Sequence, residues 1–191
     1  MRLFLVVIAA CTLGVAACSG NSPSGPSGPS GSFKLMLTDS PFSDAKAVLV
    51  TFSEVTAHRD SEEDFTTVPF AEGAMSRTCD LKKLESAQDV LGVGALPAGR
   101  YTQVRLVISS ASIYFDNAAA GNACDTAIPV PDGDSASLTI PSGEVKLNRP
   151  FEVAEGGSTT MLLDFDGDRS IRETGNGRFM MSPVIAVVSV N

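Results

Sequence analysis

Apolar and polar residues alternate along most of the chain, and few windows show the period of about 3.6 residues that marks a helix. The clearest alternation follows a Leu-Pro-Ala-Gly turn, within the stretch of residues 96–108. Within it Val104, Leu106 and Ile108 fall on one face together with Thr102, and the opposite face is mixed. We therefore predict a long central strand with one face on the core.

Similar patterns predict strands on both sides of this stretch. The apolar set of residues 47–58 slips by one position near Ser53 and Glu54, which indicates a β-bulge. Residues 84–95 look irregular, and residues 80–84 allow one helical turn. Strands are expected at residues 33–37, 47–58, 66–70, 128–130, 137–140, 143–147, 151–153, 159–166 and 179–190.

Short strands punctuated by Gly and Pro are typical of an all-β fold. We predict a β-sandwich of the transthyretin-like or Ig-like Greek-key type, with at most one or two short helices. The last strand, at residues 179–190, is nearly all apolar and is expected to be central or buried on both faces.

The N-terminus has the features of an export signal. A basic start precedes an apolar run at residues 3–15, which is too short to span a bilayer comfortably. The run ends in Val15-Ala16-Ala17-Cys18, which resembles the lipobox of bacterial lipoproteins. That resemblance implies cleavage before Cys18, diacylglycerol on its sulfur, and acylation, with palmitate for instance, of the new amine. An ordinary secretory signal with a chance cysteine is the alternative.

This interpretation divides the chain into three segments. They are a signal peptide at residues 1–17, a lipidated cysteine and Pro/Ser/Gly tether at 18–32, and a folded domain at 33–191. The tether has no apolar surface to bury, and a flexible chain of that length spans roughly 20 Å. We expect a location in the bacterial cell envelope, and Ser19 after the cysteine favours the outer membrane.

The charge balance is acidic. The chain has 14 Lys and Arg against 22 Asp and Glu, for a net charge of −8, and no basic cluster. Nucleic acid is therefore not expected as a partner, and contact with the membrane is expected through the lipid on Cys18. Arg100 and Arg105, on the mixed face of the central strand, are expected to pair with acidic neighbours.

The cysteines of the folded domain form an even pair. Cys11 lies in the signal peptide, which leaves Cys79 and Cys124 in an exported, oxidising setting. We predict a disulfide between them, worth about 4 kcal/mol in the chain-entropy model. Two free thiols are the alternative. The single histidine and the wide cysteine spacing do not favour a zinc site.

Asp164, Asp166 and Asp168 are the strongest candidates for metal ligands. On an extended strand their side chains would point the same way, and carboxylate oxygens suit Ca²⁺. Asp39 and Glu173 are candidates for added ligands. However, the glycine and the glutamate that an EF-hand loop requires are missing at their positions. A polar turn whose charge is neutralised by neighbouring arginines is the favoured interpretation, so no cofactor is expected and Ca²⁺ is the alternative.

No catalytic constellation is visible. His58 is the only histidine, no Gly-x-Ser-x-Gly motif occurs, and the absence of Trp makes a poor aromatic platform for sugars. We therefore expect a non-catalytic binding or structural domain, with an envelope protein, a polymer or a small ligand as its partner. The alternative is a calcium-stabilised binding module, or a metal-assisted hydrolase, that uses the three aspartates.

Three stretches carry a family resemblance in combination. They are Leu37-Thr38-Asp39-Ser40-Pro41, residues 96–106, and Leu162-Leu163-Asp164-Phe165-Asp166 followed by Pro183-Val184-Ile185. Their order resembles that in lipoproteins of the domain of unknown function 4382, DUF4382, over nearly all of residues 33–191. The resemblance implies a secreted or lipid-anchored β-sandwich and brings no established activity. The Leu-Pro-Ala-Gly-x-Tyr turn also looks like that of transthyretin-like sandwiches, which supports the fold alone.

Overall fold

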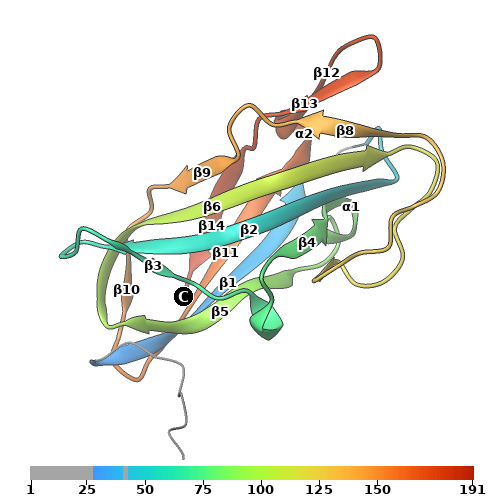
Figure 1. The fold of residues 1–191 in the computed structure, drawn as a ribbon. Coiled ribbons are helices and arrows are strands. Elements are labelled where there is room, and N and C mark those ends of the chain that lie inside the picture. The colour runs from blue at the N-terminus through green and yellow to red at the C-terminus, as the bar shows by residue number, and fades with distance from the viewer. Residues whose placement is uncertain (1–27, 41–42) are drawn as a thin grey trace, which may run out of the picture.

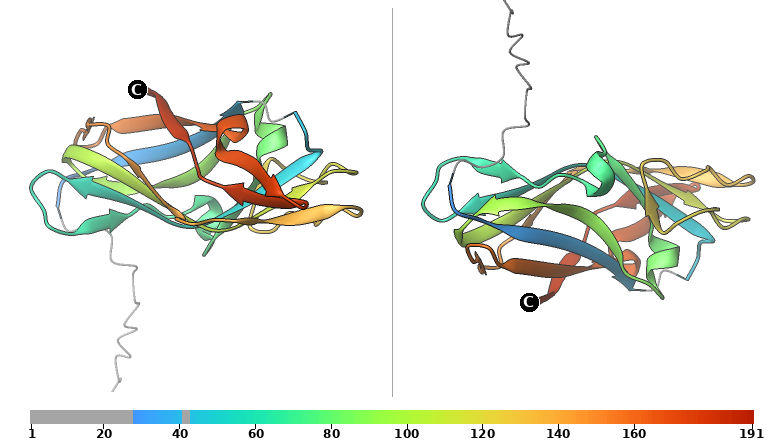
Figure 2. Two further views of the ribbon diagram at one scale, coloured as in Figure 1. Left: turned by 90° about the horizontal axis from the view of Figure 1, so that it is seen from above. Right: turned by 90° about the horizontal axis from the view of Figure 1, so that it is seen from below.

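The computed structural model describes residues 28–40 and 43–191 of the chain. Two β-sheets pack face to face, so the β-sandwich prediction is confirmed (Figures 1 and 2). The predicted signal peptide, Cys18 and most of the predicted tether lie outside the described residues. Within the described part, every helix is too short or too polar to cross a membrane.

The smaller sheet has four strands, and its central pair is parallel. β1 begins at Ser30, so the last residues of the expected tether are already part of this sheet. In spatial order the strands are β14 (Ile185–Val190), β11 (Ser158–Asp166), β1 (Ser30–Ser40) and β5 (Asp89–Pro97).

The larger sheet is built on the antiparallel pair of β2 (Ala47–Arg59) and β6 (Gly99–Tyr114). The free edge of β6 is taken by three short strands, namely β8 (Ser135–Thr139), β9 (Glu144–Leu147) and β10 (Phe151–Val153). The other edge of β2 pairs with β3 (Phe65–Thr67) and β4 (Arg77–Asp80), and β4 pairs with β7 (Cys124–Asp125).

The remaining elements are short. β13 (Arg178–Met181) extends the larger sheet through β8, and β12 (Ile171–Gly175) pairs with β13. The helices are η1 (Ala71–Gly73), α1 (Leu81–Leu84), where a helical turn was predicted, and α2 (Gly167–Ser170).

The core lies between the sheets and follows the predicted alternation. Leu35 of β1, Leu163 of β11 and Leu106 of β6 have no exposed surface. The expected bulge in β2 is confirmed, because its register with β6 shifts between Phe52 and Glu54. The bulge keeps the apolar set of β2 on the core side along its whole length.

The expectation that residues 84–95 are irregular is wrong, because they contain most of β5. Gly92 and Gly94 interrupt the apolar alternation there. A Cβ atom at Gly94 would lie 2.6 Å from Cδ of Pro69, so the close passage of the Pro69 segment requires glycine in this strand. Gly92 and Gly94 have no side chain that could continue the alternation, so the sequence pattern did not indicate this strand.

The predicted strand at residues 179–190 is also different in the structure. It is divided into β13 and β14, which belong to different sheets, and Pro183 lies in the break. β14 is an edge strand, and Val188 in it is 57% exposed, so burial on both faces is wrong. The predicted strand at 128–130 does not form.

The turn before β6 is fixed by Tyr101. Its ring is fully buried, with its centroid 5.0 Å from that of Phe151, and its hydroxyl donates a hydrogen bond of 2.8 Å to the Pro97 carbonyl. Gly99 has φ 145°, which few other residues adopt, and a Cβ atom there would lie 3.2 Å from Cδ of Arg59. The Leu-Pro-Ala-Gly-x-Tyr motif is thus a closed turn locked by one buried phenol.

Replacing the phenol with a phenyl ring tests this lock. Tyr101→Phe should lower the free energy of unfolding by about 1 kcal/mol, because the Pro97 carbonyl loses its donor. Urea unfolding of the disulfide-intact protein measures the change. Tyr114→Phe is the matched control, because Tyr114 is also a buried tyrosine of β6 but packs in a separate cluster with Ala47 and Leu49. A similar loss in both variants would contradict the proposed lock.

Candidate functional site

The outward side of the larger sheet carries a set of polar side chains over β3, β2, β6 and β9. Side chains of β6 alternate between the two sides of the sheet. Val104 and Leu106 point into the core, so Gln103 and Arg105 point outward. Strand register then places His58 between Phe65 and Gln103. We call this surface the polar face and define it by His58, Phe65, Gln103, Arg105, Glu144 and Asn148.

Arg105 is at the centre of the polar face. Its Cζ atom lies 3.8 Å from the centre of the Phe65 ring, which is a cation–π contact. Its Nε donates a hydrogen bond of 2.7 Å to Oε1 of Gln103 and lies 3.4 Å from Oε1 of Glu144. The expected acidic partner of Arg105 is therefore confirmed, whereas Arg100 has no ion pair among the residues described.

Further contacts order the side chains around Arg105. Nε2 of Gln103 donates a hydrogen bond of 2.5 Å to Oδ1 of Asn148. Nδ1 of His58 lies 3.0 Å from the Thr102 hydroxyl, and its ring centre lies 4.8 Å from that of Phe65. Side chains from β2, β3, β6 and the residue after β9 thus hold one another in place.

Two hollows of the polar face adjoin each other. One, of about 440 Å³, is lined by His58, Phe65, Thr102, Gln103, Arg105 and Asn148. The other, of about 310 Å³, is lined by Glu54, Thr56, Phe65, Thr67, Arg105, Val107 and Glu144. Phe65 and Arg105 line both, so the hollows lie next to each other across the strands, and we call the two together the groove. The lining contains hydrogen-bond donors and acceptors that a polar ligand could contact.

The sequence analysis names His58 only as the single histidine and Arg105 only as a partner of an acidic residue, and it does not predict this groove. Gln103 belongs to the mixed face of the central strand, and no sequence pattern indicates a functional role for Asn148 or Phe65. These residues come together through strand pairing over long sequence separations. The one local signal was the polar outward half of the central strand.

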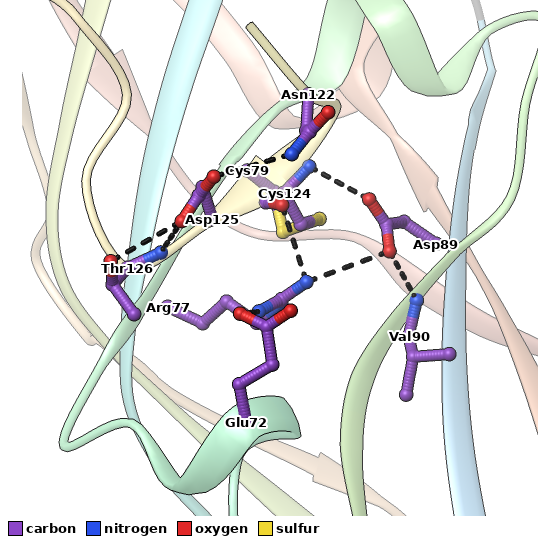
Figure 3. Close-up of polar contacts among 9 residues, drawn as sticks. All are labelled: Glu72, Arg77, Cys79, Asp89, Val90, Asn122, Cys124, Asp125 and Thr126. Atoms are coloured by element: carbon purple, nitrogen blue, oxygen red, sulfur yellow. Dashed lines mark hydrogen bonds and ion pairs between the residues drawn. A yellow bond between two sulfur atoms is a disulfide. The ribbon is translucent and has the colours of Figure 1, made fainter.

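The predicted disulfide between Cys79 and Cys124 is confirmed (Figure 3). The Cα atoms are 4.1 Å apart, and the two residues are 0% and 2% exposed. Cys79 of β4 and Cys124 of β7 lie directly opposite each other in the sheet. The bond therefore joins neighbouring strands, whereas a link between two loops was expected. This burial makes the bond a structural staple.

Arg77 lies beside the disulfide and is itself buried (Figure 3). Its Nη2 donates a hydrogen bond of 3.2 Å to the Cys124 carbonyl and lies 3.6 Å from Oδ1 of Asp89. The other oxygen of Asp89 accepts a hydrogen bond of 2.9 Å from the Cys124 amide. Arg77 and Asp89 therefore tie β5 to β7, and we assign this cluster a structural role.

Asp164, Asp166 and Asp168 do not form one row. Asp164 accepts a hydrogen bond of 2.8 Å from the Ser40 hydroxyl. Asp166 caps α2 by accepting a hydrogen bond of 3.0 Å from the Arg169 amide, and it forms an ion pair of 3.6 Å with the Arg169 side chain. Asp168 lies inside α2, because the strand ends at Asp166. Arg169 thus neutralises part of this turn, as the polar-turn interpretation requires.

In the part of the chain that the structure describes, the suggested added ligands do not complete a metal site with these aspartates, although Asp39 pairs with Phe165 and lies near Asp164. Asp39 is on the core side of β1, and Glu173 accepts a hydrogen bond of 3.3 Å from the Gly177 amide at the β12–β13 turn. Among residues 28–40 and 43–191, no group of His, Cys, Asp or Glu side chains is arranged to hold a metal ion. Calcium binding by the three aspartates stays a prediction that this geometry does not favour.

Asp39 is an unusual buried carboxylate. It is 5% exposed, and neither of its oxygens has a hydrogen-bond partner among the residues that the structure describes. Burial, together with the negative charges of Glu85 and Asp164, raises the pKa of Asp39 to about 8. The Gly167 amide approaches without regular hydrogen-bond geometry, and it and Lys82 oppose this rise only in part. The side chain is therefore mainly protonated at neutral pH.

Removal of the disulfide tests its role as a staple. The double variant Cys79→Ala/Cys124→Ala should lose about 4 kcal/mol of unfolding free energy, because the bond closes a loop of 45 residues. Chemical denaturation of the variant and the wild type gives the difference. Because the bond is buried, thiol reagents should reduce it only under conditions that unfold the wild type. Rapid reduction of the folded protein would contradict this assignment.

Asp39 should make stability depend on pH. Between about pH 4 and pH 8 the folded protein keeps a proton that the unfolded chain releases, so stability should fall as pH rises through this window. Asp39→Asn should reduce the slope by at most about 1.4 kcal/mol per pH unit. Denaturation at a series of pH values measures it. The exposed Asp168→Asn is the control, and equal slopes in wild type and Asp39→Asn would refute the assignment.

Comparison with known proteins identifies the family. The model for Domain of unknown function (DUF4382) matches residues 30–183, which covers both sheets apart from the last strand. No curated protein and no solved structure matches the chain. The family resemblance found in the sequence is thereby confirmed, and the chain belongs to the DUF4382 family.

Proposed function

We propose that this protein is a lipid-anchored cell-envelope protein whose β-sandwich is a non-catalytic binding module. The polar face is its binding surface. The observation that carries the proposal is the ordered groove in which Arg105 is held by Phe65, Gln103 and Glu144. Side chains that are already ordered lose little further freedom when a ligand binds, which favours affinity.

Several groups of the groove are available to a ligand. Nε2 of His58, Nδ2 of Asn148 and the terminal nitrogens of Arg105 form no hydrogen bond with any residue that the structure describes. They surround hollows that open on the sheet surface. A concave surface with fixed polar groups is typical of ligand sites.

The proposed location rests on the sequence and on the cysteines. Cys18 follows a lipobox-like segment, and the chain between it and the start of β1 at Ser30 can hold the domain roughly 20 Å from the lipid. The buried Cys79–Cys124 disulfide supports an exported, oxidising compartment. No observation specifically favours the alternative of a calcium-stabilised module or metal-assisted hydrolase over the polar-face module.

Labelling with palmitate tests the anchor. Full-length protein made in a bacterium with lipoprotein processing should incorporate the label and sediment with membranes, because two or more acyl chains anchor stably. Cys18→Ala should abolish the label. Cys11→Ala is the matched control and should keep it, because Cys11 is removed with the signal peptide. Label on the Cys18→Ala protein would contradict the proposal.

Binding to isolated cell envelopes tests the polar face. Detergent-purified full-length protein should cosediment with detergent-washed envelope material, and Arg105→Ala should weaken this binding at least fivefold. Arg172→Ala is the matched control, because Arg172 is an exposed strand arginine outside the groove. If wild type and Arg105→Ala bind equally, the polar face is not the binding surface.

A further inference from the structure

We infer that the polar face binds an uncharged saccharide chain. This inference rests on the proposed function and adds the chemical class of the ligand. It follows from the charge balance, the hydrogen-bonding groups and the shape of the groove.

Charges on the polar face cancel locally. Oε1 of Glu144 lies 3.4 Å from Nε of Arg105 and 3.5 Å from Nζ of Lys146. Glu54 adds a second carboxylate to the lining. The local charge therefore gives no attraction to a polyanion, and the net charge of −8 opposes one. An uncharged ligand needs no such attraction and is not repelled by the net negative charge.

Apolar surface on the polar face is small. Phe65 and Val107 are its large apolar side chains, and both are partly buried. The exposed large hydrophobic residues of the described chain are elsewhere, namely Met75, Val93, Val130 and Val188. The fully buried centre of a protein–protein interface is more apolar than the average surface, so this surface suits a protein partner less well.

The hydrogen-bonding groups match hydroxyls, which donate and accept. Arg105 and the Asn148 amide supply donors, and the carboxylates of Glu54 and Glu144 supply acceptors. His58 supplies either role through Nε2. These groups come from β2, β6, β9 and the residue after β9, so a sugar chain lying across these strands can meet both donors and acceptors.

The groove has room for a chain. Its two hollows, of about 440 and 310 Å³, share Phe65 and Arg105 and together run across β3, β2, β6 and β9. Because the sequence has no Trp, and Arg105 covers the Phe65 ring, hydrogen bonds must supply more of the affinity than ring stacking. With few aromatic rings available for stacking on sugar rings, recognition depends mainly on hydrogen bonds to the sugar hydroxyls.

Affinity electrophoresis of the full-length protein in mild detergent tests the inference. Native gels would contain hydroxyethyl cellulose, laminarin, xylan or soluble starch, with polymer-free gels and gels containing alginate or heparin for comparison. We expect retardation in at least one neutral polymer and none in the anionic polymers. Arg105→Ala and Asn148→Ala should each raise the apparent Kd at least tenfold, and Arg172→Ala should behave as wild type.

The outcomes separate this inference from the proposed function. No retardation in any neutral gel, retardation that the Arg105 and Asn148 variants leave unchanged, or stronger retardation by alginate or heparin would each overturn it. If Arg105→Ala still weakens binding to envelopes in those cases, the binding module stands and its ligand is of another class, an envelope protein for example. If Arg105→Ala has no effect in either assay, both proposals fail.

Discussion

The antiparallel pairing of β2 with β6 is the interaction on which the rest of the structure depends. It joins the two longest strands over nearly their full length, and a bulge near Glu54 keeps the apolar residues of β2 on the core side. All other strands of the larger sheet attach to this pair directly or through one another. The smaller sheet then covers its inner side, as Figure 2 shows.

The same pairing has two consequences on opposite sides of the sheet. Inward residues such as Val104 and Leu106 build the core, and their outward neighbours Gln103 and Arg105 meet His58 and Phe65 on the surface. A change of one residue in register would exchange these two sets. The stability of the domain and the geometry of the polar face therefore have a common origin.

Polar side chains have different roles in the core and on the surface. Arg77 and Asp89 beside the disulfide support the backbone of β5 and β7, while Asp39 is buried without a hydrogen bond to any described residue. On the polar face, by contrast, the side chains hold one another and still present free donors and acceptors. That difference is the reason for assigning the ligand to the surface groove and a structural role to the buried clusters.

By itself, the sequence determined the features that depend on nearby residues. The alternation in residues 96–108, the bulge near Ser53 and the even pair Cys79 and Cys124 all follow from local periodicity or simple cysteine chemistry. Only the tertiary structure decided which strands are neighbours. Alternation assigns a side chain to a face but not to a partner strand, so it could not show that β14 is an edge, that Pro69 passes over β5, or that Asn148 meets Gln103.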